Sequence, residues 1–271
     1  MNINNLNFLF WNINNKDLSK EIGDLVSENS INILGLAEVP KINQIENILD
    51  NNNLKKYNII GCNRVQLYSD FNDYLINPLS DTDYYSINEI LFKNKLSIII
   101  ILVHLPSKMY NNNEDDLHEM GYILKNDIEN IEIKIKNKKT IVFGDFNMNP
   151  FEKGLVAANS LHAVSSSDIA LQNDSYIKKK KYSLFYNPMW SQFNDLNRVP
   201  GSYYYHSSNI VNYYWNIFDQ VIIRPDLITY FDLSTLRFIT ETNSYKLISL
   251  NNRPSVSDHL PLYFSIKRSV I

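Results

Sequence analysis

Several apolar stretches of this chain end in a carboxylate, an amide or an imidazole. In "VFGDFNMNP", residues 142–150, the apolar run stops at Asp145 and Asn147. Other stretches place polar residues at or beside a predicted strand in the same way, namely Asn12 and Asn14, Glu38, His104, Asp219, and Asp258 with His259. One polar strand end means little, but six in one chain indicate that these side chains converge on a common rim.

The residue types on this rim narrow its chemistry. Carboxylate and amide oxygens are hard ligands, and no thiolate accompanies them, which favours Mg²⁺ or Mn²⁺ over Zn²⁺. The two histidines are then free to transfer protons or to bind phosphoryl oxygens. A metal site combined with acid–base groups and amides indicates phosphoester hydrolysis.

Apolar periodicity predicts helices that alternate with strands. Strands are expected near 6–13, 31–38, 57–61, 87–93, 96–104, 139–145, 217–223, 245–250 and 261–267. Helices are expected near 17–28, 42–49, 113–136 and 151–158, and the acidic start "NEDD" complements the dipole of the third. This alternation indicates a layered α/β or α+β domain. No linker or repeat divides the chain, so we expect a single domain over residues 1–271.

Composition places the chain among ordinary globular proteins, with 271 residues of which 44% are hydrophobic and 20% charged. The single cysteine, Cys62, excludes an internal disulfide and suits a reducing compartment. The most apolar run, residues 96–105, is about half as long as a membrane helix. We therefore expect a cytoplasmic protein with no membrane span. The net charge of −3 argues against non-specific coating of DNA but not against a local substrate groove.

A family resemblance joins these motifs. "WNIN", "GLAEV", "VHLPS", "GDFNMNP", "FDQVII" and "SDHLPL" resemble the motifs of the endonuclease/exonuclease/phosphatase superfamily and follow its order over residues 10–264. The superfamily holds apurinic/apyrimidinic endonucleases, pancreatic-type deoxyribonucleases, deadenylases, inositol polyphosphate 5-phosphatases and neutral sphingomyelinases. The resemblance implies an α+β fold, a four-layer αββα sandwich of two mixed β-sheets flanked by helices, with the active site at one end.

The resemblance also implies which residues hold the metal. Glu38 is similar to the main metal-binding glutamate, Asp258 to the C-terminal metal ligand, and Asn12 to the asparagine beside the metal. Asn14 departs from the abasic-site enzymes, which have an aspartate at this position. This difference argues against an abasic-site enzyme and leaves catalysis in place.

The remaining motif residues resemble the catalytic groups of the family. Asp145 matches the aspartate that positions or deprotonates the attacking water, and Asn147 the asparagine that steadies the pentacoordinate phosphorus. His259 matches the histidine that faces the scissile phosphate, and Asp219 the aspartate that orients this histidine. His104 resembles the histidine that most of these phosphodiesterases hold against the phosphate oxygens.

The substrate has to be interpreted from the segment 176–216, which combines a basic run with many aromatic residues. Aromatic rings stack on unpaired bases and lysines follow phosphates, so nucleic acid is the expected partner. The alternatives are that the rings belong to the core or to a protein interface and that the lysines form a solvated loop. The basic run consists of Lys178, Lys179, Lys180 and Lys181. A Mg²⁺- or Mn²⁺-dependent nuclease is favoured. A phosphatase or phosphodiesterase for a small or lipid phosphate and a non-catalytic scaffold of the same fold are the alternatives.

Overall fold

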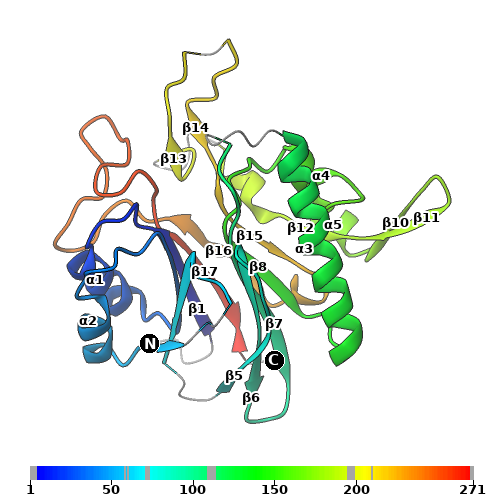
Figure 1. The fold of residues 1–271 in the computed structure, drawn as a ribbon, viewed down its shortest axis with the longest axis horizontal. Coiled ribbons are helices and arrows are strands. Elements are labelled where there is room, and N and C mark those ends of the chain that lie inside the picture. The colour runs from blue at the N-terminus through cyan, green and yellow to red at the C-terminus, as the bar shows by residue number, and fades with distance from the viewer. Residues whose placement is uncertain are drawn as a thin grey trace.

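The computed structural model describes residues 5–57, 59, 61–70, 74–108, 114–193, 199–208 and 210–268. Two mixed β-sheets pack face to face, and helices cover their outer faces (Figure 1). The expected four-layer αββα sandwich is therefore confirmed.

The first sheet has six strands in the order β16-β17-β1-β2-β4-β3. They are β1 (Asn5–Asn12), β2 (Ile33–Ala37), β3 (Lys55–Tyr57), β4 (Val65–Ser69), β16 (Phe231–Phe238) and β17 (Leu262–Lys267). Helices α1 (Ser19–Asn29) and α2 (Ile45–Asn51) cover its outer face. Strands β1 and β2 are parallel, and the other neighbours are antiparallel.

The second sheet has seven strands in the order β5-β6-β7-β8-β15-β12-β9. They are β5 (Tyr74–Asp81), β6 (Tyr85–Phe92), β7 (Ser97–His104), β8 (Thr140–Asp145), β9 (Ala163–Val164), β12 (Phe185–Tyr186) and β15 (Asp219–Ile223). Helices α3 (Glu114–Ile135) and α4 (Lys153–Val156) lie on its outer side (Figure 1).

Smaller elements complete the described chain. Strands β10 (Asp174–Ile177) and β11 (Lys180–Ser183) form one hairpin, and β13 (Tyr203–Tyr204) pairs with β14 (Trp215–Asn216) in another. Helix α5 (Ser167–Ala170) and the 3₁₀ helices η1 (Pro188–Gln192) and η2 (Pro225–Leu227) are short. No helix in the described part of the chain is both long enough and apolar enough to cross a membrane.

Strand β7 shows why the run "SIIIILVH" is apolar throughout. Its side chains alternate between two cores, because the sheet is covered on both faces. One set packs between the two sheets, namely Ile98, Ile100 and Leu102. The other set packs against α3, namely Ile99, Ile101 and Val103. Stacked and edge-on contacts among Phe8, Phe143 and Phe264 fill the centre of the core between the sheets.

Strand direction brings the polar strand ends to one edge of the sandwich. Parallel pairing of β1 with β2 sets Asn12 beside Ala37, and parallel pairing of β7 with β8 sets His104 beside Asp145. The antiparallel strand β15 begins with Asp219 opposite Asp145. The rim predicted from the sequence is therefore present at this edge.

Most expected elements occur, with shifted ends. The long helix spans Glu114–Ile135, and residue 113 of the expected range lies outside the described residues. The strand expected near 57–61 ends at Tyr57, and residues 58 and 60 of that range are likewise not described.

The strand expected at 245–250 is wrong. The described segment 241–254 folds back on itself through isolated bridges, Glu241 with Lys246 and Ile248 with Pro254. Leu250 in this segment is fully exposed, so its apolar side chain has no sheet face to cover.

Candidate active site

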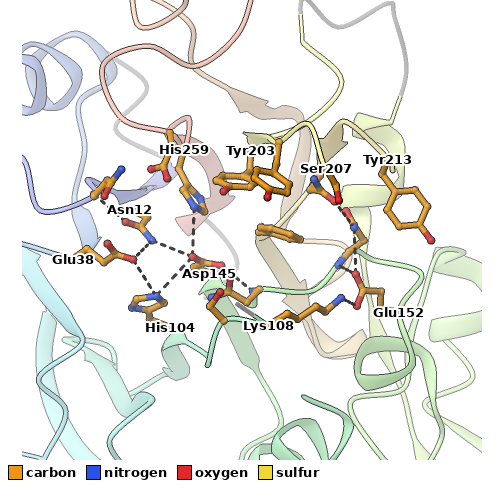
Figure 2. A pocket seen from close by; sticks show the side chains of 18 of the residues that line it. Asn12, Glu38, His104, Lys108, Asp145, Glu152, Tyr203, Ser207, Tyr213 and His259 are labelled. Atoms are coloured by element: carbon orange, nitrogen blue, oxygen red, sulfur yellow. Dashed lines mark hydrogen bonds and ion pairs between the residues drawn. The ribbon is translucent and has the colours of Figure 1, made fainter. Parts of the chain in front are cut away.

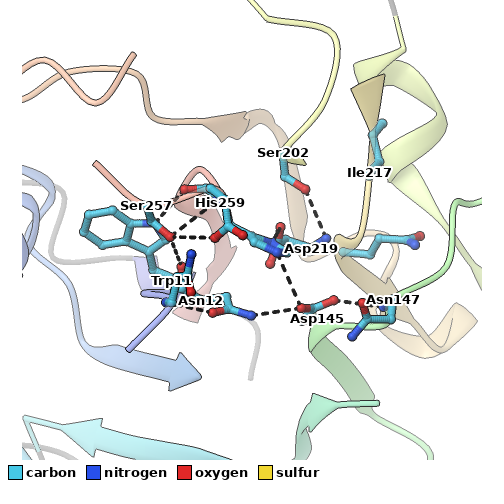
Figure 3. A network of polar contacts seen from close by, with 12 residues as sticks. Trp11, Asn12, Asp145, Asn147, Ser202, Ile217, Asp219, Ser257 and His259 are labelled. Carbon is cyan, nitrogen blue, oxygen red and sulfur yellow. Dashed lines mark hydrogen bonds and ion pairs between the residues drawn. The ribbon is translucent and has the colours of Figure 1, made fainter. Parts of the chain in front are cut away.

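Asp219 and His259 form a buried pair at the rim (Figure 3). His259 Nδ1 lies 2.7 Å from Asp219 Oδ2. Burial disfavours a charged imidazole, but the carboxylates of Asp219 and Asp145 outweigh it and raise the pKa of His259 to about 10. The protonated ring is therefore favoured, and in that form Nδ1–H donates to Asp219. This is the contact that the family resemblance implies.

The loop that carries His259 is fixed to β1 and to β13 (Figure 3). Trp11 Nε1 donates to the carbonyl of His259 at 2.9 Å, and Ser257 Oγ donates to the carbonyl of Asn12 at 2.8 Å. The ring of Tyr203 lies 4.7 Å from the imidazole, and the two residues share a β-bridge. Backbone and side-chain contacts together thus set the orientation of the imidazole.

Asp145 occupies the centre of the site (Figure 2). Its Oδ1 accepts from the backbone N–H of Asn147 at 2.8 Å, and its Oδ2 accepts from Asn12 Nδ2 at 3.1 Å. The same Oδ2 lies 3.9 Å from His104 Nε2 and 3.9 Å from His259 Nε2. One carboxylate oxygen is thus fixed by its own loop, and the other faces both histidines.

Glu38 holds its carboxylate at the rim in a strained backbone conformation. Its φ of 51° lies in the left-handed region, which glutamate seldom adopts and which costs on the order of 1 kcal/mol. Its Oε1 accepts from Asn12 Nδ2 and its Oε2 from Asn15 Nδ2, both at 3.1 Å. His104 Nε2 lies 3.6 Å from Oε1. Such strain is common at functional sites, because the surrounding contacts have to maintain it.

Glycine is required just before Asp145. Gly144 has a φ of 138°, and a Cβ placed there would lie 2.1 Å from the carbonyl oxygen of Val103. The close approach of β8 to β7 therefore depends on this residue. Beyond the strand, Asn147 also takes a left-handed conformation, with φ at 51°, and its Nδ2 donates to the carbonyl of Leu105 at 2.8 Å.

These residues line one end of a cavity of about 580 Å³ (Figure 2). Every predicted metal-binding and catalytic residue except Asp219 lines it, and Asp219 lies behind His259. The far end is lined by Lys108, Asn149, Glu152, Tyr213 and Asn216. The cavity has the size of a small-molecule site, for which about 300–1,000 Å³ is typical.

No model of a protein family and no curated protein sequence matches this chain. Its structure, by contrast, is similar to many solved ones. A Bacteroides thetaiotaomicron protein described as an endonuclease/exonuclease/phosphatase family protein superposes with a TM-score of 0.59 at 14% identity, over 97% of this chain and 94% of that one. This chain has the endonuclease/exonuclease/phosphatase fold.

Two further structures share this endonuclease/exonuclease/phosphatase fold. The catalytic domain of human Nocturnin has a TM-score of 0.59 at 14% identity, over 97% of this chain and 93% of its own. TDP2 from D. rerio, complexed with a single-strand DNA product, has a TM-score of 0.55 at 16% identity, over 96% of this chain and 98% of its own. At such identities the likeness establishes the fold.

The acidic end of the cavity fits a divalent cation. Asp145, Asp219 and His259 offer ligand atoms within 4.8 Å of one another. However, His259 Nδ1 is already hydrogen-bonded to Asp219, which leaves only Nε2 of this ring for another partner. Glu38 and Asp258 are better placed, because both carboxylates line the cavity; that of Glu38 also lies near Asp145, since the two accept from the same Asn12 amide and so concentrate negative charge.

The lysine run lies away from this cavity. Residues 178–181 form the turn between β10 and β11 and the start of β11. This hairpin projects from the right of the molecule in Figure 1. Lys178 and Lys179 have positive φ values at this tight turn, and Lys181 pairs with Asp174 at 2.8 Å. None of the four lines the cavity. The structure therefore does not bring these lysines together with the other predicted site residues.

Sequence reasoning also missed several residues that line the cavity. Asn149 joins the loop after β8 to the residues before β15, because its Nδ2 donates to Asn216 Oδ1 at 2.8 Å and its Oδ1 accepts from Ile217 N–H at 2.9 Å. Glu152 accepts from Asn149 N–H at 3.0 Å and pairs with Lys108. The N-x-x-E spacing at 149–152 resembles a capping box and was the available signal.

Proposed function

We propose that this protein hydrolyses phosphodiester bonds in nucleic acids with the help of a divalent metal ion. The observation that carries this proposal is the buried Asp219–His259 pair, whose free ring nitrogen lies 3.9 Å from Asp145 Oδ2 within the cavity. A fixed carboxylate and a charged imidazole in one enclosed site suit attack by water on a phosphate.

Each of these residues has its own role in the proposed reaction. Asp145 Oδ2 orients a water molecule toward the phosphorus and accepts its proton as the new O–P bond forms. His259 Nε2 donates a hydrogen bond to a non-bridging oxygen, where negative charge increases. Asn147 and His104 line the same end and bind the remaining phosphoryl oxygens. The bond to the leaving oxygen then breaks, and that oxygen takes a proton from solvent.

Glu38 and Asp258, with Asn12 beside them, would hold the metal. Mg²⁺ or Mn²⁺ suits these oxygen ligands better than a softer ion does. When bound, the ion would neutralise phosphate charge and polarise the P–O bond.

Nucleic acid is proposed as the substrate on two grounds. TDP2 from D. rerio was solved with a single-strand DNA product, and NExo from Neisseria, with a TM-score of 0.51, was solved with a product DNA hairpin. In addition, aromatic residues line the outer part of this cavity.

We further propose that the protein is cytoplasmic, because its one cysteine suits a reducing compartment.

The proposal is tested by a digestion panel. Purified protein is incubated with single-stranded DNA, duplex DNA, RNA and small phosphodiesters, each with Mg²⁺, with Mn²⁺ or with EDTA. We expect hydrolysis of nucleic acid with either ion and none with EDTA, and a His259→Ala variant serves as the control for contaminating nucleases. Hydrolysis of phosphomonoesters alone would instead favour the phosphatase alternative.

A further inference from the structure

Three aromatic rings form a row that leads outward from His259. Phe218 and Tyr203 stack with their ring centres 5.2 Å apart and their planes 26° apart. Tyr203 and Tyr205 follow at 6.5 Å and 21°. All three line the cavity, and Figure 2 shows Tyr203 beside His259. The row therefore connects the catalytic end of the cavity with solvent.

The outer end of this row is open. Tyr205 is 50% exposed, although it is a large ring on the cavity wall. On the opposite side Tyr213, which is 56% exposed, packs edge-on against Phe151 at 5.2 Å. Two aromatic walls thus flank the path by which a ligand reaches Asp145.

A polar group lies across the β13–β14 pairing from Tyr203. Asn216 lines the cavity and is 8% exposed. Its Oδ1 accepts from Asn149, whereas its Nδ2 has no hydrogen-bond partner among the described residues. A buried amide with free donors next to flat rings suits a ligand that is planar and carries acceptors on its edge.

We infer that this row is a stacking platform for one unpaired base next to the scissile phosphate, so that the substrate is single-stranded nucleic acid or a frayed strand end. Every base has a π-face that can stack on tyrosine, and Asn216 would donate to its edge. A base inside a duplex has both faces covered and its edge paired, so it cannot use the platform without leaving the helix. This inference rests on the proposed phosphodiesterase activity.

The β13–β14 hairpin supplies a matched control. Tyr214 is 47% exposed, and its carbonyl accepts from the N–H of Tyr205 at 2.8 Å. Its ring stacks on His206 at 5.4 Å and does not line the cavity. Tyr205→Ala and Tyr214→Ala therefore remove similarly exposed rings from adjacent positions of one hairpin, and only the first removes a cavity wall.

The experiment compares substrates with and without a base. kcat/KM is measured for thymidine 3′- and 5′-(p-nitrophenyl phosphate) and for methyl p-nitrophenyl phosphate. We expect the ratio between the better thymidine ester and the methyl ester to fall about tenfold in Tyr205→Ala, the loss expected from one stacked base. Tyr205→Phe and Tyr214→Ala should keep the wild-type ratio. A single-stranded oligonucleotide should also be cleaved faster than the same strand in a duplex.

The outcomes separate the inference from the proposed function. An unchanged ratio in Tyr205→Ala, or an equal fall in Tyr214→Ala, overturns the stacking platform while diester hydrolysis still stands. A change of oligomeric state in Tyr205→Ala, measured by light scattering, would identify the ring as part of a protein interface and also overturns it. Failure of the wild-type protein to hydrolyse any diester overturns both.

Discussion

Replacement of Asp219 by Asn should slow hydrolysis about a hundredfold without unfolding the protein. Asparagine keeps the size of the side chain but removes the charge 2.7 Å from His259 Nδ1. Burial lowers the pKa of His259, but the charges of Asp219 and Asp145 outweigh it and raise this pKa to about 10, so asparagine at position 219 removes a charge that favours the protonated ring. Asparagine also cannot hold the ring as a charged acceptor does, and the loss of one preorganised group in an active site costs about a hundredfold in rate.

The assay is kcat at saturating Mg²⁺ for four proteins, namely wild type, Asp219→Asn, His259→Ala and the double variant. Because Asp219 acts through His259, the double variant should be little slower than His259→Ala alone. The pH above which activity declines should also be lower in Asp219→Asn, because the pKa of His259 falls when its partner loses its charge. Losses that multiply in the double variant would refute the coupling, and an unchanged rate in Asp219→Asn would refute the role of the pair.

Glu132→Gln is the matched control for removing a buried charge. Glu132 is a buried residue of helix α3, which covers the outer side of the second sheet. It accepts two hydrogen bonds from Arg224 at 2.9 and 3.0 Å and does not line the cavity. Breaking such a pair costs about 3–5 kcal/mol of stability. We expect a lower free energy of unfolding with kcat unchanged in the folded fraction, which is the reverse of the pattern for Asp219→Asn.

Three further predictions concern the metal, the lysine hairpin and pH. Glu38→Gln should raise the Mg²⁺ concentration needed for half-maximal activity and lower the rate about a hundredfold; an unchanged rate at limiting Mg²⁺ would contradict this. Replacing the lysines at 178–181 with Ala should leave hydrolysis of a small diester unchanged, because their hairpin lies outside the cavity. On long strands, each lost phosphate contact should lower the slope of log binding constant against log salt concentration by about 0.7–0.9. An identical slope would mean that these lysines contact no phosphate. Burial lowers the pKa of Lys125 to about 8. Between pH 8 and 10 this lysine therefore binds more protons in the unfolded chain than in the folded one, and its contribution to the free energy of unfolding should rise with pH. Lys125→Met should lack this rise in urea denaturation, and superimposable pH curves would rule it out.

The sequence predicted the long apolar strands in the middle of each sheet, and it missed the edge strands β5 and β16 as well as the interior strand β4. β7 and β8 are apolar on both faces, so their runs are unmistakable. β5 is an edge strand that contains Pro78, with a register shift between Pro78 and Ser80. β16 is also an edge strand, and its register shifts between Asp232 and Arg237. A bulge interrupts the alternation on which strand prediction depends.

The residues of the site likewise fall into those that the sequence predicted and those that it missed. Cavity residues such as Asp145 and His259 were predicted because each lies within a motif at a strand end. Tyr203 was not, because its contact with His259 joins two loops and depends on the fold. The second half of the cavity depends on contacts of this kind, including the Asn149–Asn216 hydrogen bond. A basic run such as 178–181 signals charge, but its distance from the site is decided by a local hairpin.

The most direct test of the central claim is the rate of nucleic-acid hydrolysis by the purified protein before and after removal of divalent metal, beside His259→Ala. We predict cleavage of a single-stranded oligonucleotide with Mg²⁺ or Mn²⁺, its loss in EDTA, its recovery when Mg²⁺ is added in excess, and at most residual cleavage in His259→Ala under every condition. Full activity in EDTA, or equal activity in His259→Ala, would contradict the account.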